Sequence, residues 1–581
     1  MTAFATPPNG IARWVDRILS APVVILLLVP TMWLRFGWIA GWHDFGWTYE
    51  PAARICAGEV QYRDFHTALP PLTHYSLAAL MGMFDNSLHW FQAHLYAWWA
   101  ASLLAAWALA AQVLPDRRLV AAVVLAVGLS HLPHQLQHSY NFAGQALAAA
   151  AAALVLRWRA SAPAAAAAGL LIGLAFFGKP VVGAAAGAAL TAILLPAGGR
   201  SWQPFWAFGA GVAAVLAGVT AGFAEAVGWT EAVEQIFWEP GQAKGGTLVV
   251  LARSFPRFRF EWDFGFRAAA ETGLTLVVGT LVTVYGLYGC ASASPGTRRL
   301  LAAAVAGFAG IAVTSLRPNE TVAAALDALP QMLASRFLHQ LLYVSAFFLA
   351  AATALRSVRG EGRNLLGPGI LAVTAVVGHC ASSINYPPTT GALLFPAGAW
   401  LLVRLGRGGD AAFWLGLYCL AAVTADLFLD SYQHHGFRPV APLADTGPLA
   451  GLYGSAPDAE VSRARQDAIV PAVRGRRTVW MTNAGPHSAF GGLPAPNIAC
   501  IYHDAYVARR ELLLRDRWEQ DPPERVVLGP CTASPQSEFF RSDVFADWLA
   551  ARYAPVVSAG GLTVHVRRST LNAAFVIGPT D

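Results

Sequence analysis

The residues best placed to do chemistry lie in one loop near the N-terminus, from Trp42 to Leu72. This loop directly follows a predicted membrane-spanning helix at 20–41 and contains Asp44, which has Trp42 and Trp47 close by. Aromatic residues of this kind favour the membrane–water interface. Desolvation there raises the pKa of a carboxyl group and makes it a usable general base for a hydroxyl or amine acceptor. Asp44 is the predicted catalytic residue, and the alternative is a solvated acid that marks the membrane exit.

A second group of candidates lies in the same loop, in the run Tyr62-Arg63-Asp64-Phe65. Arginine suits phosphate because its planar guanidinium grips two oxygens at once. Asp64 has two interpretations of equal weight. It either takes part in a substrate site or pairs with Arg63 and orders the loop. Tyr62, Arg63 and Asp64 are predicted substrate-binding residues on the first interpretation.

The composition is that of a polytopic membrane protein. The chain has 581 residues, of which 56% are hydrophobic and 13% are charged, and its mean hydropathy is +0.45. Apolar windows of about 20 residues, long enough to cross a bilayer, recur from residue 20 to residue 430. The net charge of +6 is carried almost wholly by arginine, because Lys179 and Lys244 are the two lysines of the sequence. The segment 22–40 is too long for a signal-peptide core and is predicted to be an uncleaved first span.

The apolar windows predict thirteen spans with a cytoplasmic N-terminus, which makes residues 1–430 a transmembrane domain. With this topology every short arginine cluster falls on the cytoplasmic side, as the positive-inside bias requires. The predicted spans are 20–41, 88–113, 119–135, 144–157, 162–178, 180–197, 203–225, 266–289, 298–316, 336–355, 365–384, 388–404 and 411–430.

The topology depends on how the apolar stretch 72–84 is interpreted. It has only about 13 residues, too few to cross the bilayer comfortably, and counting it as a span would put Arg117 and Arg118 outside. We therefore predict an interfacial or re-entrant helix at 72–84 on the outer face, preceded by a second short helix near 49–57. Both belong to an outer loop at 41–87.

The composition changes near Ser431, and residues 431–581 are predicted to form a small extracytoplasmic α/β domain. Alternating patterns predict strands at 477–483, 495–502, 524–530 and 562–568, and helical spacing predicts a helix at 542–553. An odd number of spans puts this domain outside the cytoplasm. Cys500 and Cys531 could form a disulfide in it or stay as free thiols, because pairing cannot be deduced from spacing.

The outer loop resembles the first outer loop of GT-C glycosyltransferases. The resemblance rests on Asp44, Tyr49, Gly58, the run 62–65 and Pro70-Pro71-Leu72. It is strongest toward the branch of protein O-mannosyltransferases and the aminoarabinose transferase of lipid A. These enzymes move a sugar from a polyprenyl phosphate to an acceptor on the outer face. The resemblance implies that Asp44 matches the loop acid held to be catalytic in that family.

A second resemblance to the same family lies at Gly178-Lys179-Pro180, which follows GLLIGLAFF. The matching family segment has a lysine that closes a helix at the outer face. The motifs are moderately specific and cover 42–84 and 169–181, whereas the thirteen-span plan with an exported C-terminal domain fits nearly the whole chain.

The chain also departs from the family pattern. Phe45 stands where an acid often follows the catalytic one, Ala68-Leu69 replaces a Glu-Lys pair, and the loop 131–145 lacks an acid. These changes weaken the case for a divalent metal between the loops, so no metal ligand and no certain cofactor is predicted. His131, His134 and His138 could still bind a metal at helical spacing. The favoured interpretation is that these histidines hydrogen-bond lipid phosphate or each other at the interface. His138, Tyr140 and Asn141 of this loop are predicted substrate-binding residues.

A polyprenyl-phosphate donor requires fixed positive charge near the bilayer surface, because it leaves as a phosphate. Lys179 is costly at a helix end unless it is paired or snorkels, and its motif match favours a role in the site. The loop 226–265 also carries basic residues among aromatics, so it could lie on the membrane and close over the donor. An equal alternative is that 252–263 forms an amphipathic surface element that binds anionic lipid headgroups. The acids of this loop, Glu231, Glu234 and Glu239, give no specific signal. The remaining predicted substrate-binding residues are Arg253, Arg257, Arg259, Arg317 and Arg336.

The sequence therefore predicts a GT-C-type membrane glycosyltransferase in a bacterial inner membrane. Its partners are the polyprenyl-phosphate sugar donor and a lipid, glycan or protein acceptor. Direct displacement by the acceptor oxygen would invert the anomeric centre. The alternative is a flippase or transporter of lipid-linked sugars, which usually shows broken helices and mid-membrane polar residues. The predicted spans are instead rich in Ala, Leu and Gly, and the polar residues gather at one face.

Overall fold

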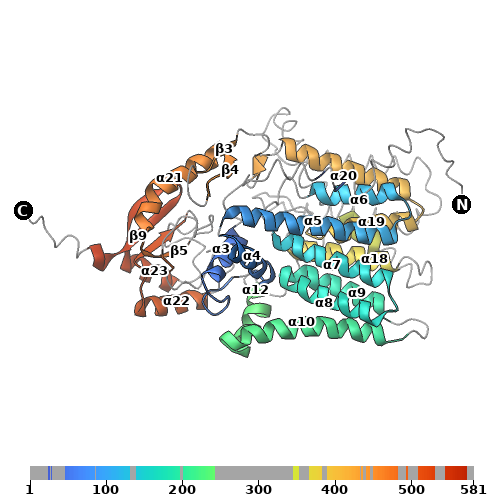
Figure 1. The fold of residues 1–581 in the computed structure, drawn as a ribbon, viewed down its shortest axis with the longest axis horizontal. Helices are drawn as coiled ribbons and strands as arrows, with labels where there is room; N and C mark the ends of the chain where they lie inside the picture. Colours follow the sequence, from blue (N-terminus) through green and yellow to red (C-terminus); the bar gives the residue numbers. More distant parts are fainter. Residues whose placement is uncertain are drawn as a thin grey trace, which may run out of the picture.

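The protein consists of a bundle of apolar helices with a mixed β-sheet at one end (Figure 1). The computed structural model describes residues 24–25, 28, 46–67, 69–85, 87–130, 139–195, 201–242, 344–351, 366–382, 389–428, 430–431, 434–435, 440–444, 449–481, 493–494, 508–529 and 543–571.

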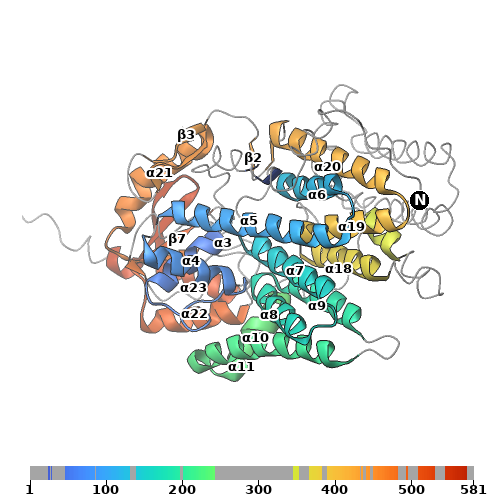
Figure 2. The ribbon, with the colours of Figure 1, turned by 45° about the vertical axis from the view of Figure 1, so that its right-hand side comes forward.

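The long helices from α5 to α10 run back and forth along the bundle, with α18, α19 and α20 beside them (Figures 1 and 2). The bounds of the helices in this first part are α3 Gly46–Cys56, α4 Leu72–Met83, α5 Leu88–Val113, α6 Arg117–Ser130, α7 Ser139–Arg157, α8 Ala162–Gly178, α9 Pro180–Leu194, α10 Gln203–Val227, α11 Trp229–Val233, η1 Glu234–Trp238, α12 Glu239–Gln242, α18 Leu366–Ser382, α19 Gly391–Arg404 and α20 Gly408–Phe428.

Three of the described helices are long and apolar enough to cross a membrane, namely α5, α7 and α10. The helices α8, α9, α18 and α19 are apolar but shorter. Each predicted span between 88 and 225 corresponds to a helix, and so do the predicted spans between 365 and 430. The spans 266–289 and 298–316 lie outside the described residues, so the total of thirteen remains a prediction.

The two short helices predicted in the outer loop are present, and their interfacial position remains a prediction. α4 covers Leu72–Met83 and so ends one residue before the end of the predicted range 72–84. α3 covers Gly46–Cys56 and so begins three residues before the start of the predicted range 49–57. Both lie at the end of the bundle that faces the sheet (Figure 1). Because α5 starts at this end and its 26 residues extend about 39 Å, Arg117 at the start of α6 lies at the opposite end. Arg157 closes α7 at that opposite end.

The second part contains a five-stranded sheet with the order β6-β5-β7-β9-β8. β6, β5 and β7 are parallel, whereas β9 runs antiparallel to β7 and to β8. Two short antiparallel pairs, β1–β2 and β3–β4, precede it. The bounds are β1 Asp430–Ser431, β2 His434–His435, β3 Val440–Pro442, β4 Tyr453–Ser455, α21 Ala456–Val473, β5 Arg477–Met481, β6 Leu493–Pro494, α22 Ala508–Gln520, β7 Arg525–Leu528, α23 Asp543–Arg552, β8 Tyr553–Ala559 and β9 Leu562–Arg567.

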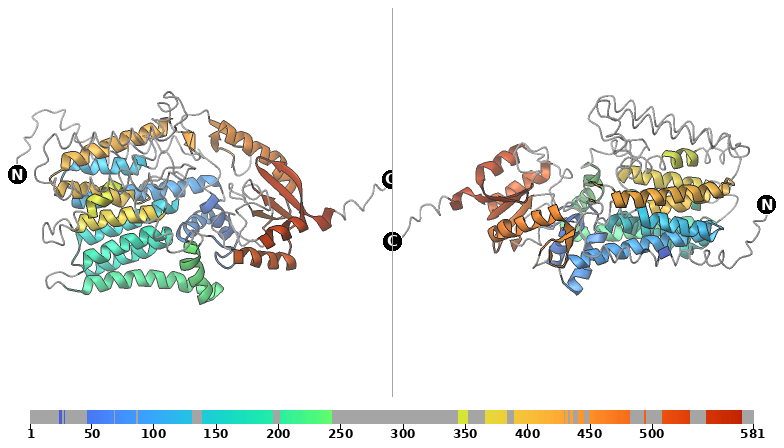
Figure 3. Two further views of the ribbon diagram at one scale, coloured as in Figure 1. Left: turned by 180° about the vertical axis from the view of Figure 1, so that it is seen from behind. Right: turned by 90° about the horizontal axis from the view of Figure 1, so that it is seen from above.

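The sheet is covered on both faces, as the alternation along its strands requires. Val479 and Val526 face α22 and α23 on one side. Trp480 and Val527 face α21 on the other. Figure 3 shows helices on opposite sides of the strands. The strands predicted at 477–483, 524–530 and 562–568 and the helix predicted at 542–553 are confirmed. The strand predicted at 495–502 and the two cysteines of the proposed disulfide lie outside the described residues. The predicted boundary at 431 and the location of this part outside the cytoplasm remain predictions.

One apolar cluster joins the sheet to the outer helices. Tyr49 of α3, Leu77 of α4 and Phe91 of α5 share it with Leu452 and with Val564 of β9. Burial of such side chains is the main favourable term in packing two elements together. The outer loop is therefore held between the helical bundle and the sheet.

Small residues set the distance between α8 and α10. A Cβ atom added to Gly169 would lie 2.2 Å from the carbonyl oxygen of Phe208, and one added to Gly211 would lie 2.4 Å from that of Ala166. Gly169 and Gly173 form a small-xxx-small pattern, which allows two helix backbones to approach closely in a membrane. The position of α10, and of the segment that follows it, depends on this contact.

We expect Gly169→Val to destabilise the bundle by about 1–3 kcal/mol, because the added methyl groups must push the α10 backbone away. Gly209→Val is the matched control, since Gly209 lies on the exposed side of α10 with nothing within 4 Å of its added Cβ. Thermal unfolding of both variants in detergent measures the difference. Equal midpoints for the two variants would contradict the close contact.

Candidate functional site

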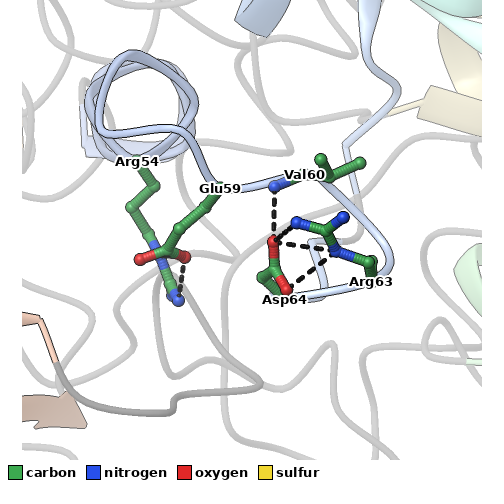
Figure 4. A network of polar contacts seen from close by, with 5 residues as sticks. All are labelled: Arg54, Glu59, Val60, Arg63 and Asp64. Atoms are coloured by element: carbon green, nitrogen blue, oxygen red, sulfur yellow. Dashed lines mark hydrogen bonds and ion pairs between the residues drawn. The ribbon is translucent and has the colours of Figure 1, made fainter. Parts of the chain in front are cut away.

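The loop after α3 is ordered by two ion pairs (Figure 4). Arg54 Nε donates to Glu59 Oε2 at 2.7 Å, and its guanidinium lies over the ring of Phe65. Asp64 Oδ2 accepts from the Val60 N–H at 2.7 Å and from Arg63 Nη2 at 2.7 Å. Hydrogen bonds from Arg63 hold the pKa of the Asp64 carboxyl below its usual range. Of the two interpretations offered for Asp64, this geometry favours the loop-ordering pair.

Tyr62 is strained and buried at the base of this loop. Its φ of 73° lies in the left-handed region, where bulky residues are rare and which is often associated with functional sites. Its N–H donates to the carbonyl of Phe65, and its ring packs edge-on against Phe223 of α10 with centroids 4.8 Å apart. It also shares an apolar cluster with Phe177, two residues before Lys179. Burial raises the pKa of the phenol.

His74 of α4 connects three parts of the outer loop. Its Nδ1 lies 3.0 Å from Gln61 Oε1, and its Nε2 lies 3.1 Å from the carbonyl oxygen of Trp47 at the start of α3. Gln61 Nε2 in turn donates to the Leu69 carbonyl. Complete burial lowers the pKa of His74 to about 3, so the ring is neutral near pH 7. A neutral ring donates from one nitrogen only, so it satisfies one of the two oxygens at a time.

A second buried polar group joins the loop to the segment after α10. His66 Nδ1 lies 3.0 Å from Gln235 Oε1 and 3.3 Å from Glu239 Oε2. Gln235 Nε2 donates to the carbonyl of Tyr62 and to Glu231 Oε1. These contacts were not predicted, because His66 belongs to no sequence motif and the acids of the loop 226–265 carry no specific signal. Only the tertiary fold brings the two segments together.

Lys179 occupies the break between α8 and α9. Pro180 at the start of α9 disfavours a helical conformation for the residue before it, and Lys179 is extended with φ −147° and ψ 99°. Its side chain is 9% exposed, and its Nζ lies 4.6 Å from the ring centroid of Tyr140. Gly144 makes room for it, since an added Cβ there would lie 2.6 Å from the Cβ of Lys179.

Several helix ends converge around Lys179. α7 begins at Ser139 beside it, so Tyr140 and Asn141 lie in the first turn of α7 and are buried. α9 begins directly after it, and α4 approaches through Leu72, which lies 3.5 Å from an added Cβ on Gly178. The N-termini of α7 and α9 carry the positive ends of helix dipoles, whereas the C-terminus of α8, which Lys179 caps, carries a negative end. The site thus combines an ammonium group with the backbone N–H groups of two helix starts, which are suited to an anion.

The structure brings together part of the predicted site. Lys179 lies over the ring of Tyr140, Asn141 follows in the first turn of α7, and Tyr62 shares an apolar cluster with Phe177 near Lys179. Among the described residues, no three His, Cys, Asp or Glu side chains converge to hold a metal ion. The predicted residues that lie outside the described ranges are Asp44, His131, His134, His138, Arg253, Arg257, Arg259, Arg317 and Arg336.

Neither protein-family models nor curated proteins match the chain. Among solved structures, it is similar to ArnT from Cupriavidus metallidurans in the apo state, with 16% identity, a TM-score of 0.41 and coverage of 98% of this chain and 100% of that one. The same ArnT bound to undecaprenyl phosphate gives 15% identity, a TM-score of 0.37 and coverage of 96% and 99%. AglB from Archaeoglobus fulgidus, in complex with an inhibitory peptide and a dolichol-phosphate, gives 12% identity, a TM-score of 0.44 and coverage of 99% and 76%.

We expect the stability of the protein to fall with decreasing pH because of His74. Between pH 6.5 and about 3 the unfolded chain binds a proton that the folded His74 does not, so stability rises with pH in this window. The slope due to this residue is at most about 1.4 kcal/mol per pH unit. Unfolding of the parent and of His74→Gln in detergent at pH 7 and pH 5 measures it. An equally steep loss in the variant would contradict the assignment to His74.

Proposed function

We propose that the protein is a membrane glycosyltransferase that takes a sugar from a polyprenyl-phosphate donor and transfers it to an acceptor at the outer face of a bacterial inner membrane. The observation that carries the proposal is the buried ammonium of Lys179 at the end of the helical bundle, beside the outer loop. An ammonium group beside the starts of α7 and α9 is suited to an anionic ligand. The phosphate of a lipid-linked sugar is such a ligand.

The orientation follows from the two ends of the bundle. Arg117 and Arg157 lie at the end opposite Lys179, and so does Arg404 at the end of α19. Arginines at short connections favour the cytoplasmic side. We infer that α3, α4, Lys179 and the sheet lie on the outer side.

The proposed reaction is a single displacement. Asp44 removes the proton from the acceptor hydroxyl, and that oxygen attacks the anomeric carbon while the bond to the phosphate oxygen breaks. The electron pair leaves with the polyprenyl phosphate, whose charge Lys179 stabilises. Tyr140 and Asn141 line the same end of α7, and arginines of the outer loops, among them Arg253, Arg257, Arg259, Arg317 and Arg336, are proposed to bind the phosphate. In-line attack inverts the anomeric centre.

The alternative function is movement of the lipid-linked sugar across the bilayer. The two functions differ in their products, because only transfer yields a free polyprenyl phosphate and a new glycoside. Incubation of the purified protein with radiolabelled polyprenyl-phosphate sugars separates them. Recovery of the donor unchanged, but on the other side of a vesicle, would favour the transporter.

Asp44→Asn is expected to abolish transfer, because an amide cannot accept the hydroxyl proton at neutral pH. Folding is expected to be normal, since the substitution keeps the size of the side chain. Transfer of labelled sugar by the purified variant measures the effect, with its size-exclusion profile as the control for folding. Near-parental turnover would refute the role of Asp44.

Lys179→Met is expected to lower kcat/KM for the donor by about 100-fold or more, because it removes a cation from a desolvated phosphate site. Lys179→Arg should retain part of the activity. Arg157→Met is the matched control, since it removes an exposed cation at the opposite end of the bundle. The measurement is initial-rate kinetics over a range of donor concentrations. Full activity of Lys179→Met would exclude a phosphate-binding role for this lysine.

A further inference from the structure

Two outer segments far apart in the sequence meet through buried polar side chains. His66 belongs to the loop 57–71, and Gln235 and Glu239 belong to the segment 229–242 that follows α10. The side chains of His66 and Glu239 are each 3% exposed, and Gln235 is 1% exposed. Hydrogen bonds between such groups are directional, and removing one partner strands the other in a dry environment. The contact therefore fixes the relative position of the two segments.

The hydrogen-bond network determines which nitrogen of His66 carries the proton. Gln235 Nε2 donates to Tyr62 and Glu231, so the amide must present its oxygen to His66. The second neighbour of Nδ1 is a carboxylate oxygen of Glu239, which is also an acceptor. His66 is consequently assigned a proton on Nδ1, from which it donates to Gln235 Oε1, with Glu239 Oε2 at 3.3 Å from the same nitrogen.

Two local distortions occur at the same contact. Residues 234–238, which include Gln235, form a π-helix, a rare turn that is frequent at functional sites. Tyr62, whose carbonyl accepts from Gln235, has the left-handed backbone described above. Such strain persists only where the surroundings hold the backbone in that conformation. Here the hydrogen bond from Gln235 holds the Tyr62 carbonyl in place.

We propose that His66, Gln235 and Glu239 form a positioning joint that holds the outer loop in register with the donor site around Lys179. This inference rests on the proposed function and assigns positioning residues to it. The path is short. Gln235 holds the Tyr62 carbonyl, the Tyr62 ring packs in one cluster with Phe177, and Phe177 lies two residues before Lys179. We expect loss of the joint to shift Tyr62 and Phe177 relative to Lys179, while the proposed donor-binding group of Lys179 is kept.

The variants His66→Ala and Glu239→Ala break the joint, whereas His66→Asn keeps a donor near the place of Nδ1 and Glu239→Gln keeps an acceptor. Glu225→Gln on the exposed side of α10 is the matched control. We expect the two alanine variants to raise KM for the donor about tenfold or more while kcat changes less. The two conservative variants should stay within about threefold of the parent. A proton-transfer role for His66 would instead abolish kcat in His66→Asn.

Hydrogen–deuterium exchange provides a readout that does not depend on activity. In both alanine variants the peptides covering 57–71 and 229–242 should lose protection together, while the peptides of α5 and α7 stay unchanged. Binding of undecaprenyl phosphate to the same samples should weaken in parallel. Unchanged exchange with unchanged binding in the alanine variants would overturn the joint, and so would an inactive His66→Asn with parental exchange.

The two proposals fail in different ways. A parent protein that transfers no sugar overturns the glycosyltransferase function, whereas the exchange measurement still decides whether the two segments are coupled. A parent that transfers sugar, with alanine variants that keep the parental KM and exchange, overturns the joint alone.

Discussion

The organisation of the outer end depends on the burial of one ammonium group. Taking a lysine out of water costs several kcal/mol unless its charge is compensated, and Lys179 is 9% exposed at the end of two apolar helices. The Tyr140 ring reduces this cost, because Nζ lies over its negative face, 4.6 Å from the ring centroid. Gly144 permits the close approach of Lys179 to α7, since an added Cβ would lie 2.6 Å from the lysine Cβ. The proposed phosphate would place a negative charge beside the same ammonium group.

The sequence predicted those features that depend on local periodicity. Apolar windows predict the helices, and the stretch 72–84, which is too short to span a bilayer, predicts the separate short helix α4. The pair Lys179-Pro180 predicts the end of a helix at this point, since proline disfavours a helical backbone for the residue before it. The alternation of apolar and polar residues predicted the strands β5, β7 and β9. In each case the physical cause lies within a few residues of the feature.

The sequence could not predict contacts made by the folded chain. Arg63 and Asp64 are adjacent, and adjacency alone does not distinguish a pair that orders a loop from two ligands of a substrate. The geometry does so, because Asp64 also accepts from the Val60 N–H. His66 and Gln235 are 169 residues apart and belong to no common motif. Their pairing depends on how α10 returns to the outer end of the bundle, which no local pattern encodes.

The outer loop is held by two kinds of contact that have different consequences. On one side, α3 and α4 share an apolar cluster with the sheet. Such contacts are strong but not directional, so they tolerate small shifts in position. On the other side, His66 and Gln235 hold the loop to the segment after α10 through hydrogen bonds of defined geometry. Apolar burial therefore keeps the loop attached, and the polar joint sets its register relative to Lys179. A transferase needs the second property, because displacement of a reacting group by about 1 Å can cost about 100-fold in rate.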